Sequence, residues 1–303
     1  MAFTIFGSGF GLYGYLPCLI ERFGEEIILQ KKQRHILEGR EELSKYIKVI
    51  KWVDDVSEAL MLCDGVVIAV PPNNQSKIVD ECLKFKNITK YLLEKPIAVN
   101  PAEALKLINS IYVSGNYISV GFIFDDLNLF NLDHFKSHDG LPNNSLKLEW
   151  LFKADHFAKN RETWKSSHRM GGGVLRFYGI HLISLLRKYG YTNVSSSFMK
   201  DIGDEPYRWE AQLSGLNLRT LDVVVDSNSP EHIFSLKSET AEVFSYPNPF
   251  YMVNNTSASL DSRISPLEGT IKRNMSNRDD TYKIIVEGIR FWHEIELLTE
   301  LIN

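Results

Sequence analysis

Cysteine is scarce in this chain: Cys18, Cys63 and Cys82 are the only three among 303 residues. They lie far apart and show none of the spacings that metal sites use. Five scattered histidines form no spaced cluster either: His134, His138, His156, His232 and His293. We therefore predict no metal site. An odd number of scattered thiols is typical of a reducing compartment, so we expect a cytoplasmic protein.

Long apolar runs and a strong net charge are also missing. The longest apolar run, GVVIAV, is far shorter than the roughly 20 residues that a membrane span needs. The first residues, MAFTIFGSGF, have no basic leader before their apolar run, so we expect no secretion signal. A formal net charge of -4 gives no electrostatic reason to expect nucleic acid or an anionic membrane as a partner.

The first 121 residues alternate short apolar runs with helix-like segments. The runs are AFTIFG, EIILQ, KVIKWV, GVVIAV, KYLLEK and YISVGF. Continuous apolar runs of this length suit strands that are buried on both faces of a parallel sheet. The segment from Pro101 to Val113 begins as a helix should, because Asn100 can cap it and proline suits the first helical position. The pattern predicts an α/β domain with a doubly wound parallel sheet over residues 1–121.

The pattern changes after residue 121. The segments SLKLEWLFKA, RWEAQLSGLNL, RTLDVVVDS and HIFSLK are typical of longer strands, and two helical segments, VLRFYGIHLISLLRKYG and YKIIVEGIRFWHEIELLTELI, accompany them. This order predicts a second domain over residues 122–303, of the α+β class and built on a mostly antiparallel, open-faced sheet.

A glycine-rich turn, FGSGFGLYG, follows the first predicted strand. Gly7 and Gly9 match the first two glycines of the dinucleotide-binding fingerprint, while Leu12 occupies the third glycine's position. Gly11 and Gly14 lie nearby and can relieve the crowding. A tight turn at the start of a helix lets backbone N–H groups bind a pyrophosphate. The alternative is a glycine-rich turn without a ligand.

Basic residues follow the second predicted strand, where an acidic residue would bind the 2′-hydroxyl of the ribose in NAD. Lys31, Lys32 and Arg34 stand there instead. Their charge suits a 2′-phosphate, which favours NADP slightly over NAD. The alternative is a solvated basic loop.

Glu94, Lys95 and Pro96 end the fifth predicted strand, at the edge of the sheet where ligands of such folds bind. With this tripeptide the chain resembles the glucose-fructose oxidoreductase / inositol dehydrogenase family, Gfo/Idh/MocA. The resemblance rests on four segments in the same order: GSGFGLYGYLP, AVPPNNQ, LLEKPIAVNPAEA and TWKSSHRMGGGVLRFYGIHLI. In the second of them, Gln75 stands where histidine is frequent.

The resemblance implies a Rossmann domain that binds NAD(P), a second domain that binds substrate and forms oligomers, and an active site between them. It implies hydride transfer to or from a carbon of a sugar or nucleotide sugar. The cofactor-binding residues that it indicates are Gly7, Gly9, Phe10, Gly11, Leu12, Lys31, Lys32, Arg34, Pro71, Pro72, Asn74, Gln75, Glu94 and Lys95. A homodimer or homotetramer is expected.

Lys95 and His181 are the two catalytic candidates of the site that the resemblance implies: Lys95 would hydrogen-bond the reacting oxygen of the substrate, and His181 would exchange the proton as general acid or base. The family's motif usually carries an aspartate four residues before this histidine, one helical turn away, and Phe177 stands there in this chain. Phenylalanine cannot orient an imidazole, but it offers an apolar wall for a sugar ring. Lys165, in the loop before the three glycines, can reach a substrate hydroxyl or phosphate. A lone histidine on an apolar helix can instead be structural.

Two other functions stay open. One is a protein that binds the dinucleotide or a sugar as a signal, without turnover, because Leu12, Gln75 and Phe177 each depart from the family's pattern. The other is a reductase for a substrate that is not a sugar, such as an imine or a tetrapyrrole.

Overall fold

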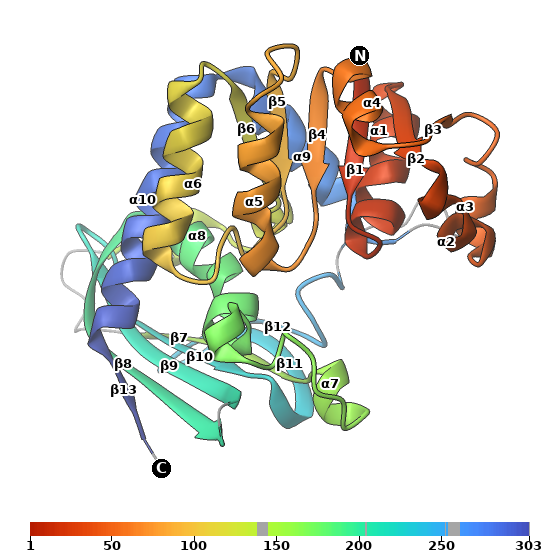
Figure 1. The fold of residues 1–303 in the computed structure, drawn as a ribbon. Helices are drawn as coiled ribbons and strands as arrows, with labels where there is room; N and C mark the ends of the chain where they lie inside the picture. Colours follow the sequence, from red (N-terminus) through yellow and green to blue (C-terminus); the bar gives the residue numbers. More distant parts are fainter. Residues whose placement is uncertain (138–144, 204, 252, 254–260, 303) are drawn as a thin grey trace. The chain divides into compact units, whose positions relative to one another are not determined.

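The chain folds into two compact units (Figure 1). The computed structural model describes residues 1–137, 145–203, 205–251, 253 and 261–302, and His138 of the sequence analysis lies outside them. The first unit comprises Met1–Ala98, Glu103–Asp126 and Val253–Lys283. The second comprises Val99–Ala102, Leu127–Met252 and Ile284–Asn303. Each unit therefore combines separate stretches of chain, and the functional division after residue 121 stays a prediction.

The first unit is built on a six-stranded sheet in the order β3-β2-β1-β4-β5-β6, and all five strand pairs are parallel. Its strands are β1 (Ala2–Phe6), β2 (Glu26–Gln30), β3 (Lys51–Val53), β4 (Gly65–Ile68), β5 (Lys90–Leu93) and β6 (Tyr117–Val120). These are the six predicted strands. The central strand β4 is buried at every residue, as expected for a sheet covered on both faces.

Helices cover this sheet on both sides (Figure 1). The helices of this unit are α1 (Leu16–Phe23), α2 (Arg34–Glu38), α3 (Glu41–Ser44), α4 (Val56–Leu62), α5 (Pro72–Cys82), α6 (Pro101–Val113) and α9 (Ile264–Ser276), of which the short α2 and α3 lie beyond the end of β2. Single turns of helix occur at η1 (Gly11–Tyr15), η2 (Lys31–Gln33) and η3 (Ile123–Asp126). Helix α9 contacts β6, η3 and α1, so a segment late in the chain, after most of the second unit's strands, completes the first unit.

The second unit is built on a seven-stranded sheet in the order β12-β11-β7-β10-β9-β8-β13. Its strands are β7 (Leu146–Lys153), β8 (Tyr191–Ile202), β9 (Glu205–Gly215), β10 (Leu221–Asp226), β11 (Asn228–Ser238), β12 (Glu242–Tyr246) and β13 (Thr299–Leu301). Among the described residues of this sheet, only the pairs β10–β7 and β13–β8 are parallel. The predicted fold class, a Rossmann sheet followed by a mostly antiparallel sheet, is confirmed.

The helical segments that accompany the second sheet include the motif with the three glycines. They are η4 (Leu132–His134), α7 (Asp155–Ala158), η5 (His168–Met170), η6 (Val174–Gly179), α8 (Ile180–Lys188) and α10 (Arg278–Leu298). The first residues of α10, up to Lys283, belong to the first unit. The turn η6 contacts β9 and β10, and α8 contacts β8, so this motif lies on the sheet.

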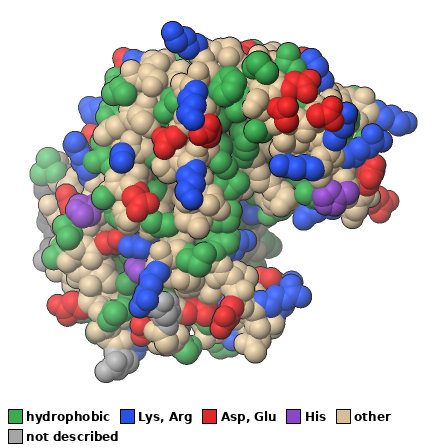
Figure 2. Space-filling model, viewed as in Figure 1, with side chains coloured by type: hydrophobic (Ala, Val, Ile, Leu, Met, Phe, Trp, Pro, Cys, Tyr) green, Lys and Arg blue, Asp and Glu red, His purple; other side chains and the backbone are tan. Residues whose placement is uncertain are grey.

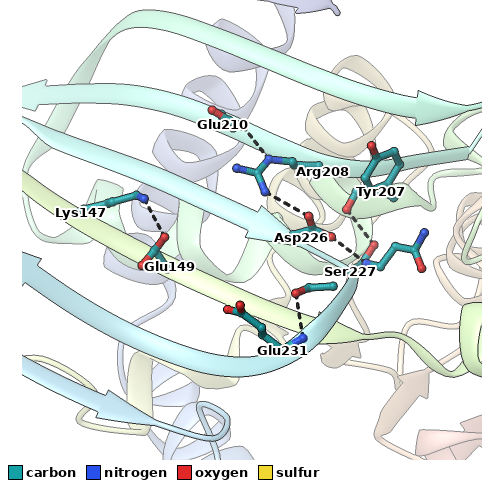
Figure 3. A network of polar contacts seen from close by, with 10 residues as sticks. Lys147, Glu149, Tyr207, Arg208, Glu210, Asp226, Ser227 and Glu231 are labelled. Atoms are coloured by element: carbon teal, nitrogen blue, oxygen red, sulfur yellow. Dashed lines mark hydrogen bonds and ion pairs between the residues drawn. The ribbon is translucent and has the colours of Figure 1, made fainter. Parts of the chain in front are cut away.

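The two faces of the second sheet differ in polarity. Trp209 and Val225 point to one face and are fully buried. Their neighbours in sequence point to the other face, where Arg208 lies between Glu210, at 2.6 Å, and Asp226, at 3.2 Å (Figure 3). Alternation of apolar and charged residues along β9 and β10 therefore gives one helix-covered face and one face of paired charges.

Acidic and basic side chains are interspersed on the face of the molecule drawn in Figure 2. The described part of the chain holds no helix with the length and apolarity that a membrane crossing requires. It also holds no group of three or more histidine, cysteine or acidic side chains arranged to bind a metal ion.

The three cysteines are buried free thiols. Burial raises the pKa of Cys18 to about 12, that of Cys63 to about 11 and that of Cys82 to about 12. With these pKa values, about one thiol in a thousand or fewer would be ionised at pH 8, and the thiolate is the reactive form.

We predict that a thiol-specific dye at pH 8 labels none of the three cysteines in the folded protein within minutes. The same dye in denaturant should label three per chain, and rapid labelling of the folded protein would contradict this account.

Candidate functional site

Three glycines shape the turn after β1, each for a different reason. Gly7 has φ of +117°, and a Cβ there would lie 2.2 Å from the carbonyl oxygen of Ala69. A Cβ on Gly11 would lie 3.0 Å from the Ile5 side chain and 3.1 Å from Ala69 Cβ. A Cβ on Gly9 would meet no atom within 4 Å. Gly7 and Gly11 therefore allow close packing within the protein, whereas Gly9 leaves space beside the backbone.

Gly11 supplies the close helix–strand approach that the fingerprint assigns to its third glycine. Leu12, which occupies that position in the sequence, is fully buried in the core. Its backbone N–H and that of Tyr13 donate to the carbonyl of Gly9 at 2.9 and 3.3 Å, which starts the helical turn η1. The backbone N–H groups of the residues before Leu12 lie at this helix start, and a helix start favours the binding of an anion.

The open space at Gly9 fits a dinucleotide. A pyrophosphate must approach the backbone closely, and a side chain at this position would block it. The residues that would hold the group here are Gly7, Gly9, Phe10 and Gly11, through their backbone N–H groups.

The basic residues after β2 lie at the surface. Lys31 pairs with Asp54 at 2.7 Å, and Arg34 pairs with Glu38 at 2.9 Å. Lys32 is exposed. Exposed ion pairs of this kind are weak and exchange readily for other partners. Lys31, Lys32 and Arg34 follow β2 as predicted, and their preference for a 2′-phosphate stays a prediction.

The segment after β4 leads into α5. Pro71 precedes the helix, Pro72 is its first residue, and Asn74 is exposed. Gln75 points into the protein and is fully buried. Its Nε2 donates to the carbonyl oxygen of Glu94 at 2.9 Å and to that of Pro96 at 2.8 Å. The amide of Gln75 therefore holds the backbone on both sides of Lys95, and a direct contact of Gln75 with the cofactor stays a prediction.

Glu94 and Lys95 follow β5 at the edge of the sheet. The backbone N–H of Glu94 donates to the carbonyl of Ile68 at 2.9 Å, and the Lys95–Pro96 peptide bond is cis. A Cβ on Gly121 would lie 2.5 Å from Oε1 of Glu94 and 2.8 Å from the hydroxyl of Tyr15. Burial and the nearby Glu94 carboxylate raise the pKa of Tyr15. Because Gly121 has no Cβ, there is room for the carboxylate of Glu94 beside the neutral phenol of Tyr15.

The second unit carries the other candidates. His181 is 5% exposed on α8. Phe177, on η6, packs edge-to-face against Trp164 with ring centroids 5.4 Å apart. The Lys165 ammonium lies 5.2 Å from the centre of the Phe177 ring, which is a cation–π distance. The structure thus brings the predicted substrate residues Lys165 and Phe177 together. Lys95 and His181 belong to different units, so the joint action predicted for them stays a prediction.

The three consecutive glycines let the backbone turn back onto the Lys165 segment. A Cβ on Gly172 would lie 2.3 Å from the carbonyl oxygen of Trp164 and 2.4 Å from that of Lys165. The backbone N–H of Gly173 donates to the Lys165 carbonyl at 2.7 Å, and Gly171 has φ of +82°. The glycines therefore place Lys165 next to η6.

Arg176 has a structural partner. Its Nε and Nη2 donate to the two carboxylate oxygens of Glu296 at 2.6 and 2.8 Å. The side chains are 13% and 15% exposed. A shielded bidentate pair of this kind ties η6 to α10.

His156 precedes the same motif in the sequence, and no local pattern predicts a role for it. Its Nε2 lies 2.7 Å from Oε1 of Glu205. Burial, and then the charge of Lys165, lower the pKa of His156, while burial raises that of Glu205. Both pKa directions favour the uncharged forms of the two groups, so the 2.7 Å contact is not a strong ion pair. The two residues are 49 positions apart, and no sequence motif links them.

Known proteins support the resemblance to this family. Residues 3–122 match the family Gfo/Idh/MocA, described as an oxidoreductase family with an NAD-binding Rossmann fold. The match begins in β1 and extends past Gly121, so it covers the glycine turn, Gln75 and Lys95. This family match confirms the prediction of an NAD(P)-binding oxidoreductase. No curated protein sequence is significantly similar to the chain.

Solved structures share the fold over almost the whole chain. The 3-ketoreductase KijD10 from Actinomadura kijaniata, solved with NADP and TDP-benzene, is 11% identical with a TM-score of 0.69, covering 100% of this chain and 98% of that one. GenD2 from gentamicin A biosynthesis, solved with NAD, is 14% identical with a TM-score of 0.71, covering 98% and 93%. The WlbA dehydrogenase from Bordetella pertussis, solved with NADH and UDP-GlcNAcA, is 11% identical with a TM-score of 0.69, covering 98% and 94%. At sequence identities of 11% and 14%, this structural similarity shows a common fold.

The buried amide of Gln75 yields a stability prediction. Replacing Gln75 with leucine would leave the carbonyls of Glu94 and Pro96 without their donor, at a cost of about 2 to 3 kcal/mol. We predict that Gln75→Leu lowers the free energy of unfolding by this amount in urea titrations. The control is Asn73→Leu, at an exposed position on the same helix, which should change it by less than about 0.5 kcal/mol. Equal stability of the two variants would contradict the role given to Gln75.

Proposed function

We propose that this protein is an NAD(P)-dependent oxidoreductase that acts on a CH–OH group, or the matching carbonyl, of a sugar or nucleotide sugar. The open space at Gly9 carries the proposal, because it combines a tight turn, a helix start and room for a pyrophosphate. The family match over residues 3–122 supports the cofactor. The substrate class is supported by similar folds solved with TDP-benzene and UDP-GlcNAcA.

The cofactor would be NADP in preference to NAD. Lys31, Lys32 and Arg34 are exposed at the end of β2, and the strand ends in Gln30 without a carboxylate. A 2′-phosphate could replace the surface carboxylates that pair with Lys31 and Arg34. Similar folds are known with either dinucleotide, so the preference depends on these residues alone.

Lys95 would donate a hydrogen bond to the reacting oxygen and stabilise the charge that develops there. His181 would exchange the proton as general acid or base. When bound, the dinucleotide supplies the hydride chemistry, and the protein orients the substrate and excludes water.

Phe177 and Lys165 would bind the substrate. The Phe177 ring offers an apolar surface to a sugar ring, and Lys165 beside it can donate to a hydroxyl or phosphate. Because Phe177 replaces an aspartate, it cannot hold the imidazole of His181. Its packing against Trp164 therefore favours a binding role.

A sensor without turnover is the second candidate function, because Phe177 removes a polar partner of the histidine. A cytoplasmic location and a homodimer or homotetramer accompany the enzyme proposal as further predictions.

The open position at Gly9 gives a direct test of cofactor binding. A methyl group there meets no protein atom within 4 Å, so Gly9→Ala should leave the melting temperature unchanged. It should weaken the binding of NADPH and NADH at least about tenfold, because the methyl group occupies the space of the pyrophosphate. Titration of nicotinamide fluorescence measures both dissociation constants. Wild-type affinity in a folded Gly9→Ala protein would refute a pyrophosphate at this turn.

The two proposed catalytic residues are tested by turnover. Lys95→Ala and His181→Ala should each lower kcat about 10²-fold to 10⁴-fold with a keto sugar or a nucleotide-linked keto sugar and NADPH, while the cofactor still binds. Lys84→Ala and His35→Ala, at exposed positions, serve as controls.

Each outcome decides between the candidate functions. Full activity of His181→Ala would remove its assigned role. Tight dinucleotide binding by the wild-type protein, without loss of nicotinamide absorbance on any sugar, would favour the sensor.

A further inference from the structure

Arg263 lies directly before α9, in the part of the chain that returns to the first unit. Its side chain is held by Asp261 through Nε at 2.9 Å and Nη2 at 2.7 Å, each to a different carboxylate oxygen. Burial alone would raise the pKa of Asp261, but the hydrogen bonds and charge of Arg263 outweigh it and lower that pKa. The planar guanidinium is thus fixed in a bidentate pair whose net charge is zero.

The fixed guanidinium lies against the aromatic residues that follow Gly9. Its centre is 4.4 Å from the centre of the Phe10 ring and 5.5 Å from that of Tyr13. Its Nη2 also lies 3.4 Å from the hydroxyl of Tyr13. Cation–π contacts of this geometry stabilise a ring in one orientation.

The Phe10 ring is confined on its other sides as well. It packs edge-to-face against Tyr13, with centroids 5.4 Å apart, and against Tyr15, at 5.6 Å. A Cβ on Gly14 would lie 2.3 Å from the ring, so the ring fills the space that this glycine leaves. Phe10 is also the N-cap residue of the helical turn η1, directly before its first residue Gly11. The orientation of its ring is therefore linked to that of the helix start.

We propose that Arg263 is a positioning residue for dinucleotide binding. It holds Phe10, and through Phe10 the start of η1, so that the backbone N–H groups of the glycine turn face the pyrophosphate. The inference rests on the proposed function of that turn. Because Asp261 neutralises Arg263, the residue acts through the ring and contributes little as a charge to the phosphate.

The test measures dissociation constants of NADPH and NADH for the full chain. Arg263→Ala should weaken both about tenfold and to a similar degree, because the pyrophosphate is common to both. To keep the charge balanced, Asp261→Ala is combined with Arg263→Ala for the salt test. The loss of affinity in this pair should then be the same at low and high ionic strength, whereas the loss of a direct phosphate contact would shrink on adding salt. Arg263→Lys should be intermediate, since an ammonium can stay over the ring but cannot form the bidentate pair. The control is Arg22→Ala, which removes an arginine 3.6 Å from Glu268 in the same unit and should bind as wild type.

A double mutant isolates the route through Phe10. If Arg263 acts through the ring, Phe10→Leu with Arg263→Ala should bind no more weakly than Phe10→Leu alone. Fully additive losses, wild-type affinity of a folded Arg263→Ala, or a loss that disappears at high salt would each overturn the proposal. Should Arg263→Ala fail to fold, wild-type affinity in both Arg263→Lys and Phe10→Leu would overturn it. A wild-type protein that binds neither dinucleotide would refute the proposed function itself.

Discussion

The approach of Gly7 to the backbone of Ala69 is the constraint on which the rest of the first unit depends. The ends of β1 and β4 are adjacent, and the N–H of Ala69 donates to the carbonyl of Phe6 at 2.8 Å. The chain can leave β1 beside the carbonyl of Ala69 only where no Cβ intervenes and where a φ of +117° is tolerated. The turn then starts a helix at Gly11, and this helix start makes the site suitable for an anion.

Local patterns in the sequence identify much of this arrangement. The apolar runs predict all six parallel strands, because strands buried on both faces need no alternation. The helix after Asn100 has the predicted bounds, since proline fixes its first residue. The glycine turn and Lys95 lie where the order of strands places them. Residues whose role follows from the backbone at a strand's end are therefore predictable from the sequence.

The remaining features depend on contacts between distant residues. Helix α9 has no expected counterpart, although Ile264, Leu267 and Ile271 are buried at helical spacing. Strand β8 is also unexpected, because serine, threonine and asparagine in YTNVSSSFMKDI give it little apolar character. Strand β12 was missed as well, and β13 was included in the predicted final helix.

The sequence also leaves roles of single side chains open. Gly11 does what the fingerprint assigns to the position of Leu12, and the amide of Gln75 holds the backbone of Glu94 and Pro96. Arg263 reaches Phe10 from 253 positions away. Such roles arise from packing, which no local spacing encodes.

Hydrogen exchange at the backbone amides of the glycine turn tests the central claim most directly. If residues 7–12 bind the pyrophosphate, saturating NADPH or NADH should slow the exchange of these amides. Unchanged exchange at residues 7–12, with protection by the dinucleotide confined to other parts of the chain, would contradict the account.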